Sequence, residues 1–308
     1  MRVTKLYTLR NKLIVSFLVV ALIPLLLLTL INKHTTQETL TNNANQALFA
    51  VASQTATSID TFITTNLNDV RVEAILPGLA KYLSLPPEAR LGTDEEKMAG
   101  DTLRSLSRRD NVNVFSYALL DLQGRNLLDT YTPDIGKDES NRDYFQQPLK
   151  TGLPYVSALR LSSRVPGLVN IYFSNPVRNA TGKTLGVLRV CYNATVVQQL
   201  ISQKTGLAGP KSFAILLDEH YIRLAHGTAP ELNFTSIVPL DSALVKQLQA
   251  EERLPKQPTA KLSTNLPTLQ KGLANAITQP YFTSQLLETG NLLNSVAVTP
   301  LKTKPWFV

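Results

Sequence analysis

The feature that most constrains this chain is an uncharged run of nineteen residues near its N-terminus, from Leu13 to Ile31. A helix of that length rises roughly 28 Å at about 1.5 Å per residue, close to the thickness of the hydrocarbon core of a bilayer. Pro24 interrupts the run, but membrane helices tolerate proline better than soluble helices do. The run therefore predicts a transmembrane helix at residues 13–31.

The basic residues around this run predict its orientation. Four precede the run and one follows it closely: Arg2, Lys5, Arg10, Lys12 and Lys33. Because Lys and Arg concentrate on the cytoplasmic side, we expect residues 1–12 in the cytoplasm, residues 34–308 outside, and the chain in the cell (inner) membrane. A cleaved signal peptide is the alternative. Its apolar region is shorter, about 7–15 residues, and is followed by a small-x-small site that this chain lacks.

Charge and cysteine content exclude further classes. The net charge is +8, but the first 34 residues hold five of the 31 basic residues and none of the 23 acidic ones. The remaining 26 basic and 23 acidic residues give only +3, so no nucleic-acid partner is expected. Cys191 is the only cysteine, which rules out an intramolecular disulfide. We expect it to be a small buried residue rather than a redox switch.

A long amphipathic helix is predicted directly after the membrane span. Its apolar residues recur at steps of three and four and form one stripe: Ala44, Leu48, Ala52, Ala56, Ile59, Ile63, Leu67, Val70 and Ala74. Pro77-Gly78 is expected to kink or end this helix, and a second helix is predicted near 94–109. The stripe suits packing on the chain's own domain and also a parallel homodimer, and we hold the two as complementary.

From residue 111 the pattern changes to strands, and it occurs twice. The segment Phe213–Asp218 echoes Tyr117–Asp121, since each is a buried strand that ends in an acid before a turn. We expect an α+β chain with two copies of one antiparallel sheet and helical insertions. Pro280–Phe282 is expected in a loop. The predicted strands are 112–120, 126–130, 155–161, 168–174, 184–192, 213–218 and 222–226, with a final hairpin of 295–299 and 306–308; the predicted helices are 141–149, 193–204 and 242–252.

Several segments carry a family resemblance. They are Asp121-x-x-Gly124, Ser140-Asn141-Arg142-Asp143-Tyr144-Phe145, Gly152–Ser157, Ile171–Val177 and Gly182–Val187. Their order resembles the double Cache (PDC-type) sensor domain, over about residues 35–308 and most strongly over 117–192.

The resemblance implies an architecture and a function. A long stalk helix and connecting helical region (35–110) would precede two tandem PAS-like antiparallel-sheet lobes. The first (111–205) would be membrane-distal and the second (211–308) membrane-proximal and incomplete at its C-terminus. Such sensors lie between two membrane helices, so this chain is expected to stop before the second span. They bind a small molecule in the distal lobe and relay a shift to cytoplasmic kinases, cyclases or chemotaxis modules.

The resemblance also implies a pocket on the distal sheet, closed by the Arg142–Phe145 segment. One subgroup recognises amino acids with an arginine, an aromatic two residues later and a distant Asp. Arg142 and Tyr144 match the first two, but Cys191 stands where the Asp should be, so we expect a carboxylate or other anion rather than a free amino acid. Alternatively, Arg142 is a structural salt bridge and the tyrosines are core aromatics. The expected ligand-binding residues are Arg142, Tyr144, Phe145, Tyr155, Tyr172 and Ser174.

No catalytic constellation is visible in the sequence. The three histidines (His34, His220 and His226) form no HExxH motif, and there is neither a Gly-x-Ser-x-Gly elbow nor a complete phosphate loop. Asp134, Asp138 and Glu139 are expected to be solvated loop charges. We therefore expect no enzymatic activity, no metal and no cofactor. The favoured function is a signal-transduction sensor for a small molecule; the alternative is a membrane-tethered solute-binding or scaffold protein without signalling output.

Overall fold

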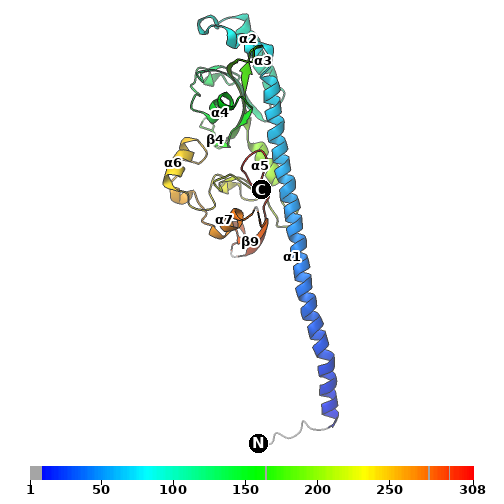
Figure 1. The fold of residues 1–308 in the computed structure, drawn as a ribbon. Helices are drawn as coiled ribbons and strands as arrows, with labels where there is room; N and C mark the ends of the chain where they lie inside the picture. Colours follow the sequence, from blue (N-terminus) through cyan, green and yellow to red (C-terminus); the bar gives the residue numbers. More distant parts are fainter. Residues whose placement is uncertain (1–8, 164, 277, 291) are drawn as a thin grey trace.

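One helix, α1 (Leu9–Glu73), runs along the whole molecule, and two lobes lie against its C-terminal half (Figure 1). The computed structural model describes residues 9–163, 165–276, 278–290 and 292–308. We call the lobe at the far end of α1 the first lobe (β1–β6, α4 and α5) and the other the second lobe (β7–β10, α6 and α7). Arg2 and Lys5, on which the predicted orientation partly rests, lie outside the described residues.

The expected membrane span falls within α1. Among the helices of the described residues, none combines the length and the apolarity needed to cross a bilayer. The transmembrane helix predicted at residues 13–31 is therefore not established by the structure.

The predicted apolar stripe of α1 packs against the chain's own lobes. Ile59 and Ile63 are fully buried in the main hydrophobic core, with Ala56 and Val70 on the same face. Steps of three and four residues keep these side chains on one side of the helix. Packing on the chain's own domain is thus confirmed.

Helix α1 ends where the sequence predicts a break. The next helix, α2 (Pro77–Ser84), begins at a proline, which is favourable in a first turn because its missing N–H would have no intrahelical partner there. Helix α3 (Asp94–Ser107) follows, and the Thr93 side chain caps it by accepting from the Glu96 N–H at 3.1 Å.

The first lobe is a six-stranded antiparallel sheet in the order β2-β1-β6-β5-β3, with β4 paired to β5. The predicted strand at 155–161 is divided in two, β3 and β4; the other expected strands of this lobe are present. The bounds are β1 (Val114–Asp121), β2 (Asn126–Asp129), β3 (Tyr155–Val156), β4 (Arg160–Leu161), β5 (Val169–Arg178) and β6 (Thr184–Asn193), with α4 (Asp143–Thr151) and α5 (Thr195–Ser202).

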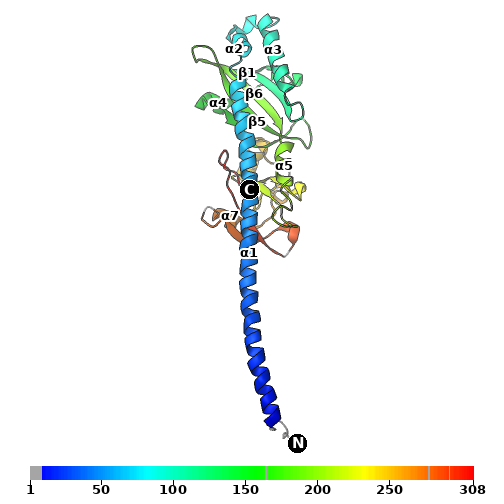
Figure 2. The same cartoon turned by 90° about the vertical axis from the view of Figure 1, so that its right-hand side faces the viewer.

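Alternation along the strands gives this sheet two different faces. Leu119, Phe173 and Val190 lie in the core shared with α1, which crosses β1, β6 and β5 (Figure 2). Tyr172 and Cys191 point to the opposite face, where they pack with residues of α4. Cys191 is fully buried, as expected.

The second lobe contains two separate two-stranded sheets rather than a copy of the first sheet. An isolated bridge between Leu217 and Phe307 joins the chain's last residues to β7. The prediction of a loop at Pro280–Phe282 is wrong, because β9 begins at Tyr281 and pairs with β10. The bounds are β7 (Ile215–Leu217), β8 (Arg223–His226), α6 (Ser242–Ala250), α7 (Pro267–Ala274), β9 (Tyr281–Gln285) and β10 (Leu293–Ala297). The α+β class is confirmed as a mixture of helices and antiparallel sheets.

The C-terminal segment is fastened to α1. The Asp60 carboxylate accepts from the backbone N–H of Lys302 and from both the N–H and the hydroxyl of Thr303, at 2.6–3.1 Å. Ser53 and Thr299 add a hydroxyl pair at 3.2 Å. A displacement of this segment is therefore coupled to α1.

We predict that Asp60→Ala destabilises the chain by about 1–3 kcal/mol, because it leaves several donors without an acceptor. Thr64→Ala, one turn further along the exposed side of α1, is the matched control and should change stability by under about 0.5 kcal/mol. Chemical denaturation of both variants measures this. Equal stability of the two variants would show that the Asp60 contacts do not hold the C-terminal segment in solution.

Candidate functional site

The segment leading into the site is shaped by a tight turn after β1. The Asp121 carboxylate accepts from the backbone N–H groups of Gln123 and Arg125, each at 2.9 Å. Gly124 has φ +83°, and a Cβ there would meet the backbone of Ser140 at 2.5 Å. Only glycine permits this approach, so Asp121-x-x-Gly124 fixes where the Ser140–Phe145 segment starts.

The same device recurs in the second lobe. The Asp218 carboxylate accepts from the N–H groups of His220 and Ile222, each at 2.9 Å. The strand-acid pattern that occurs twice in the sequence thus marks two turns, in each of which an Asp carboxylate accepts from the backbone N–H groups two and four residues later.

A buried arginine organises the face of the first sheet that packs on α4. Arg189 on β6 is fully buried, and its guanidinium lies 2.9 Å from Asp129, 3.1 Å from Glu139 and 2.7 Å from the Ser116 hydroxyl. The Asn126 amide donates to both carboxylates. Burial alone would raise the pKa of Glu139, but Arg189 and the hydrogen bonds to it hold that pKa below its ordinary value.

Tyr144 connects this network to α4. Its hydroxyl donates to Glu139 at 3.0 Å, and its ring stacks on Tyr172 with centroids 4.4 Å apart. Burial raises the pKa of the Tyr144 hydroxyl well above its ordinary value, so the group remains a donor. The Arg189 guanidinium lies 5.7 Å from the centre of the Tyr172 ring.

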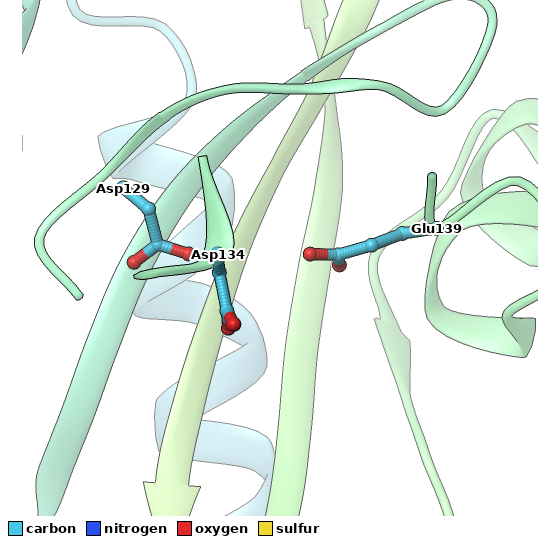
Figure 3. Close-up of side chains that lie close together, drawn as sticks. All are labelled: Asp129, Asp134 and Glu139. Atoms are coloured by element: carbon cyan, nitrogen blue, oxygen red, sulfur yellow. The ribbon is translucent and has the colours of Figure 1, made fainter. Parts of the chain in front are cut away.

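Three acids gather beside the arginine, with ligand atoms within 4.8 Å of one another: Asp129, Asp134 and Glu139 (Figure 3). Side-chain cations already pair with these acids, since Arg189 pairs with Asp129 and Glu139, and Lys137 lies 2.8 Å from Asp134. We therefore interpret the cluster as an internal ion network. The expectation of solvated charges is wrong for Asp134 and Glu139, which are buried because the 130–139 loop folds back over the sheet.

Arg142 is paired with a residue of the other lobe. Its guanidinium lies 3.3 and 3.4 Å from the Glu252 carboxylate, beyond the end of α6. Tight charge-assisted bonds measure about 2.7–2.9 Å, so this pair is loose. Burial opposes the charge of Arg142, but Tyr144 and Glu252 raise its pKa above the ordinary value.

The backbone around Glu252 is held from both sides. On the first lobe, the Leu161 N–H donates to the Glu252 carbonyl at 2.7 Å, and Arg160 donates to the Glu251 carbonyl. On the second lobe, Arg253 pairs with Asp218 at 2.8 Å. Glu252 has φ +62°, a conformation that costs free energy in a residue other than glycine. Residues 251–253 therefore form a bridge between the lobes, which we call the lobe bridge.

A small polar cavity of about 20 Å³ lies under the lobe bridge. That volume suffices for about one water molecule. Two buried polar atoms here, Asn170 Oδ1 and Arg160 Nε, have no hydrogen-bond partner in the described part of the chain. The lining residues are Arg142, Tyr144, Arg160, Ser162, Ser163, Asn170, Tyr172 and Glu252.

The structure brings together half of the predicted site residues. Arg142, Tyr144 and Tyr172 line the cavity. Three others lie nearby but do not line it. Phe145 packs in the apolar cluster of α4, the Tyr155 hydroxyl donates to Asp143 at 3.1 Å, and the buried Ser174 hydroxyl is without a hydrogen-bond partner in the described residues. Their role as ligand contacts stays a prediction.

Sequence reasoning missed Arg189, Arg160 and Glu252. The first two had a usable signal, because an arginine inside an apolar strand must find a buried partner. Glu252 had none, since its partner lies 110 residues earlier in the chain.

Comparison with solved structures identifies the architecture. No family model and no curated protein matches the sequence. The sensor domain of the V. cholerae histidine kinase DctB superposes with a TM-score of 0.66 at 16% identity, covering 88% of this chain and 96% of that one. The chain has the double Cache sensor-domain fold.

Two chemoreceptor domains support this assignment of the double Cache fold. The ligand-binding domain of Campylobacter jejuni Tlp3 in complex with 4-methylisoleucine gives a TM-score of 0.55 at 17% identity, covering 87% of this chain and 90% of that one. The ligand-binding domain of the Pseudomonas aeruginosa PAO1 amino-acid chemoreceptor PctC in complex with GABA gives 0.55 at 18%, covering 85% and 97%.

We predict that Arg189→Met lowers the free energy of unfolding by about 3–5 kcal/mol, because it leaves Asp129 and Glu139 as buried charges without their cation. Arg125→Met, in the exposed turn between β1 and β2, is the matched control and should cost under about 0.5 kcal/mol. Urea denaturation of both variants measures the difference. A loss below about 1 kcal/mol for Arg189→Met would contradict the buried network.

Proposed function

We propose that this chain is the ligand-sensing region of a membrane receptor, and that its ligand is a small carboxylate or similar anion bound by Arg142. The observation that carries the proposal is the Arg142–Glu252 pair, in which a carboxylate from the second lobe already lies on the guanidinium. A ligand carboxylate that accepts two hydrogen bonds from the Arg142 guanidinium would displace the Glu252 carboxylate. The solved relatives include domains in complex with GABA and 4-methylisoleucine, both of which carry a carboxylate.

The exchange is energetically feasible. Both side chains of the pair are about a quarter exposed and their contacts are long, so the pair contributes at most about 1 kcal/mol. A well-formed bidentate contact to a ligand exceeds that value. The cavity as it stands admits about one water, so binding also requires the lobe bridge to move.

Displacement of the Glu252 carboxylate would couple ligand binding to a movement of the two lobes. The lobe bridge joins the two lobes, and the second lobe is fastened to α1 through Asp60. A ligand that binds only the open arrangement shifts the population toward it by its differential affinity. In the full receptor, this shift would be relayed across the membrane to a kinase, cyclase or chemotaxis module. The proposal assigns no catalytic step to the chain.

Within the described residues, no free carboxylate lies at the position of Cys191 to receive an α-ammonium group. Cys191 lies in an apolar cluster, and the nearby carboxylates of Asp129 and Glu139 are bound to Arg189. We therefore favour simple carboxylates over free α-amino acids.

We predict opposite effects of two substitutions on carboxylate binding, measured by calorimetry with a panel of mono- and dicarboxylates and amino acids. Arg142→Ala abolishes binding. Glu252→Ala tightens it roughly three- to tenfold, because the competing carboxylate is gone. Glu251→Ala removes a neighbouring carboxylate that does not reach Arg142 and should leave the affinity unchanged. Weaker binding by Glu252→Ala would make Glu252 a ligand contact and contradict the competition.

We also propose that α1 anchors the chain in the inner membrane, with residues 34–308 outside. We further propose that the part of α1 that follows the uncharged run supports a parallel homodimer. The support is the uncharged run and the exposure of its large side chains, such as Leu13 (64%) and Phe17 (79%). Alkaline carbonate extraction tests the anchor: the chain should stay in the membrane pellet, and its release would contradict anchoring.

A tethered solute-binding protein without output remains the second candidate, favoured if a ligand binds but leaves the lobes unmoved.

A further inference from the structure

The second lobe contains a larger and chemically different cavity. Its volume is about 140 Å³, comparable with engineered apolar cavities of about 150 Å³ that bind benzene. Well-packed interiors rarely leave a void larger than a water molecule. It borders the lobe's own hydrophobic cluster, to which Leu217, Leu269 and Leu286 belong.

The walls of this cavity come from several parts of the chain. Leu48, Val51 and Ala52 of α1 line the cavity, and α7 contributes Leu269 and Leu273. Other lining residues come from β7 with the segment before it, from β10, and from Leu286 and Val308. The apolar part of any occupant would therefore touch α1 directly.

Two lysines are among the residues that line this largely apolar space. Lys204 and Lys211, in the connection between the two lobes, both line the cavity. Within the described residues, no ion pair joins either lysine to a carboxylate. Two lysine side chains in a lining that is otherwise mostly apolar suit a molecule with an apolar body and an anionic head.

We propose that this cavity is a second binding site, and that it takes small amphiphilic carboxylates with an apolar body of about six carbons. The ring or chain would lie against Ala52 and Leu273, and the carboxylate would lie toward Lys204 and Lys211. The site is distinct from that of Arg142 in the first lobe and does not depend on it. Because α1 forms a wall, occupancy acts on the same helix that the first lobe packs against.

The test uses the full chain in lipid nanodiscs and three soluble probes of similar shape: phenylacetate, neutral phenylacetamide and cationic phenethylamine. We expect phenylacetate to bind with a dissociation constant on the order of 0.1–1 mM, phenylacetamide roughly tenfold more weakly, and phenethylamine not measurably. The double change Lys204→Gln with Lys211→Gln should bring phenylacetate to the affinity of phenylacetamide.

Substitutions locate the bound probe. Ala52→Leu fills the cavity from α1 and should abolish binding, whereas Ala50→Leu, exposed two residues earlier on the same helix, should not. Leu273→Phe fills it from α7 and serves if Ala52→Leu does not fold. Arg142→Ala should leave unchanged the part of phenylacetate binding that Ala52→Leu removes, because that part does not use the site of the first lobe. The proposal is overturned if the folded wild-type chain binds none of the probes, or if binding survives both filling substitutions or is lost with Arg142→Ala.

Discussion

The first lobe depends on one charge, the guanidinium of Arg189 inside the sheet. A buried cation is costly unless it is paired and hydrogen-bonded on every side. Arg189 meets most of that demand through its two terminal nitrogens, which contact Asp129, Glu139 and Ser116, while its Nε has no hydrogen-bond partner among the described residues. Through Glu139 it also fixes Tyr144, which stacks on Tyr172. The floor and wall of the cavity beside Arg142 are thus set by an ion network that a ligand need not touch.

Against this rigid floor, the Glu252 side chain of the lobe bridge is weakly held. The Arg142–Glu252 contacts are long and partly exposed to solvent, and Glu252 is in a left-handed conformation. The tight contacts of the lobe bridge are to Asp218 in the second lobe and to the backbone of Leu161 in the first. A sensor needs this combination, in which a stable part recognises the ligand and a marginal contact changes when it arrives. The Arg142–Glu252 pair is that marginal contact.

Much of the local structure was predictable from the sequence, and the long-range contacts were not. The stripe from Ala52 to Ala74 and the break at Pro77 follow from helix periodicity and proline stereochemistry, and both are confirmed. The Arg142–Phe145 segment was found because its motif is local. Asp134 and Glu139 were misassigned, because their burial depends on a loop folding over the sheet and, for Glu139, on a partner fifty residues away. Strand β9 was not predicted, because a proline followed by two aromatic residues is compatible with a loop as well as with the start of an edge strand.

The most direct test of this account is the distance between the lobes with and without ligand. Spin labels at Lys150→Cys on α4 and Lys246→Cys on α6 lie on exposed positions, while Cys191 is buried and should not be labelled. Pulsed electron paramagnetic resonance then measures the label separation. Our account predicts that a bound carboxylate shifts the distance distribution, and that Glu252→Ala shifts it the same way without ligand. An identical distribution in all three states would contradict the claim that the Arg142–Glu252 contact couples ligand binding to lobe movement.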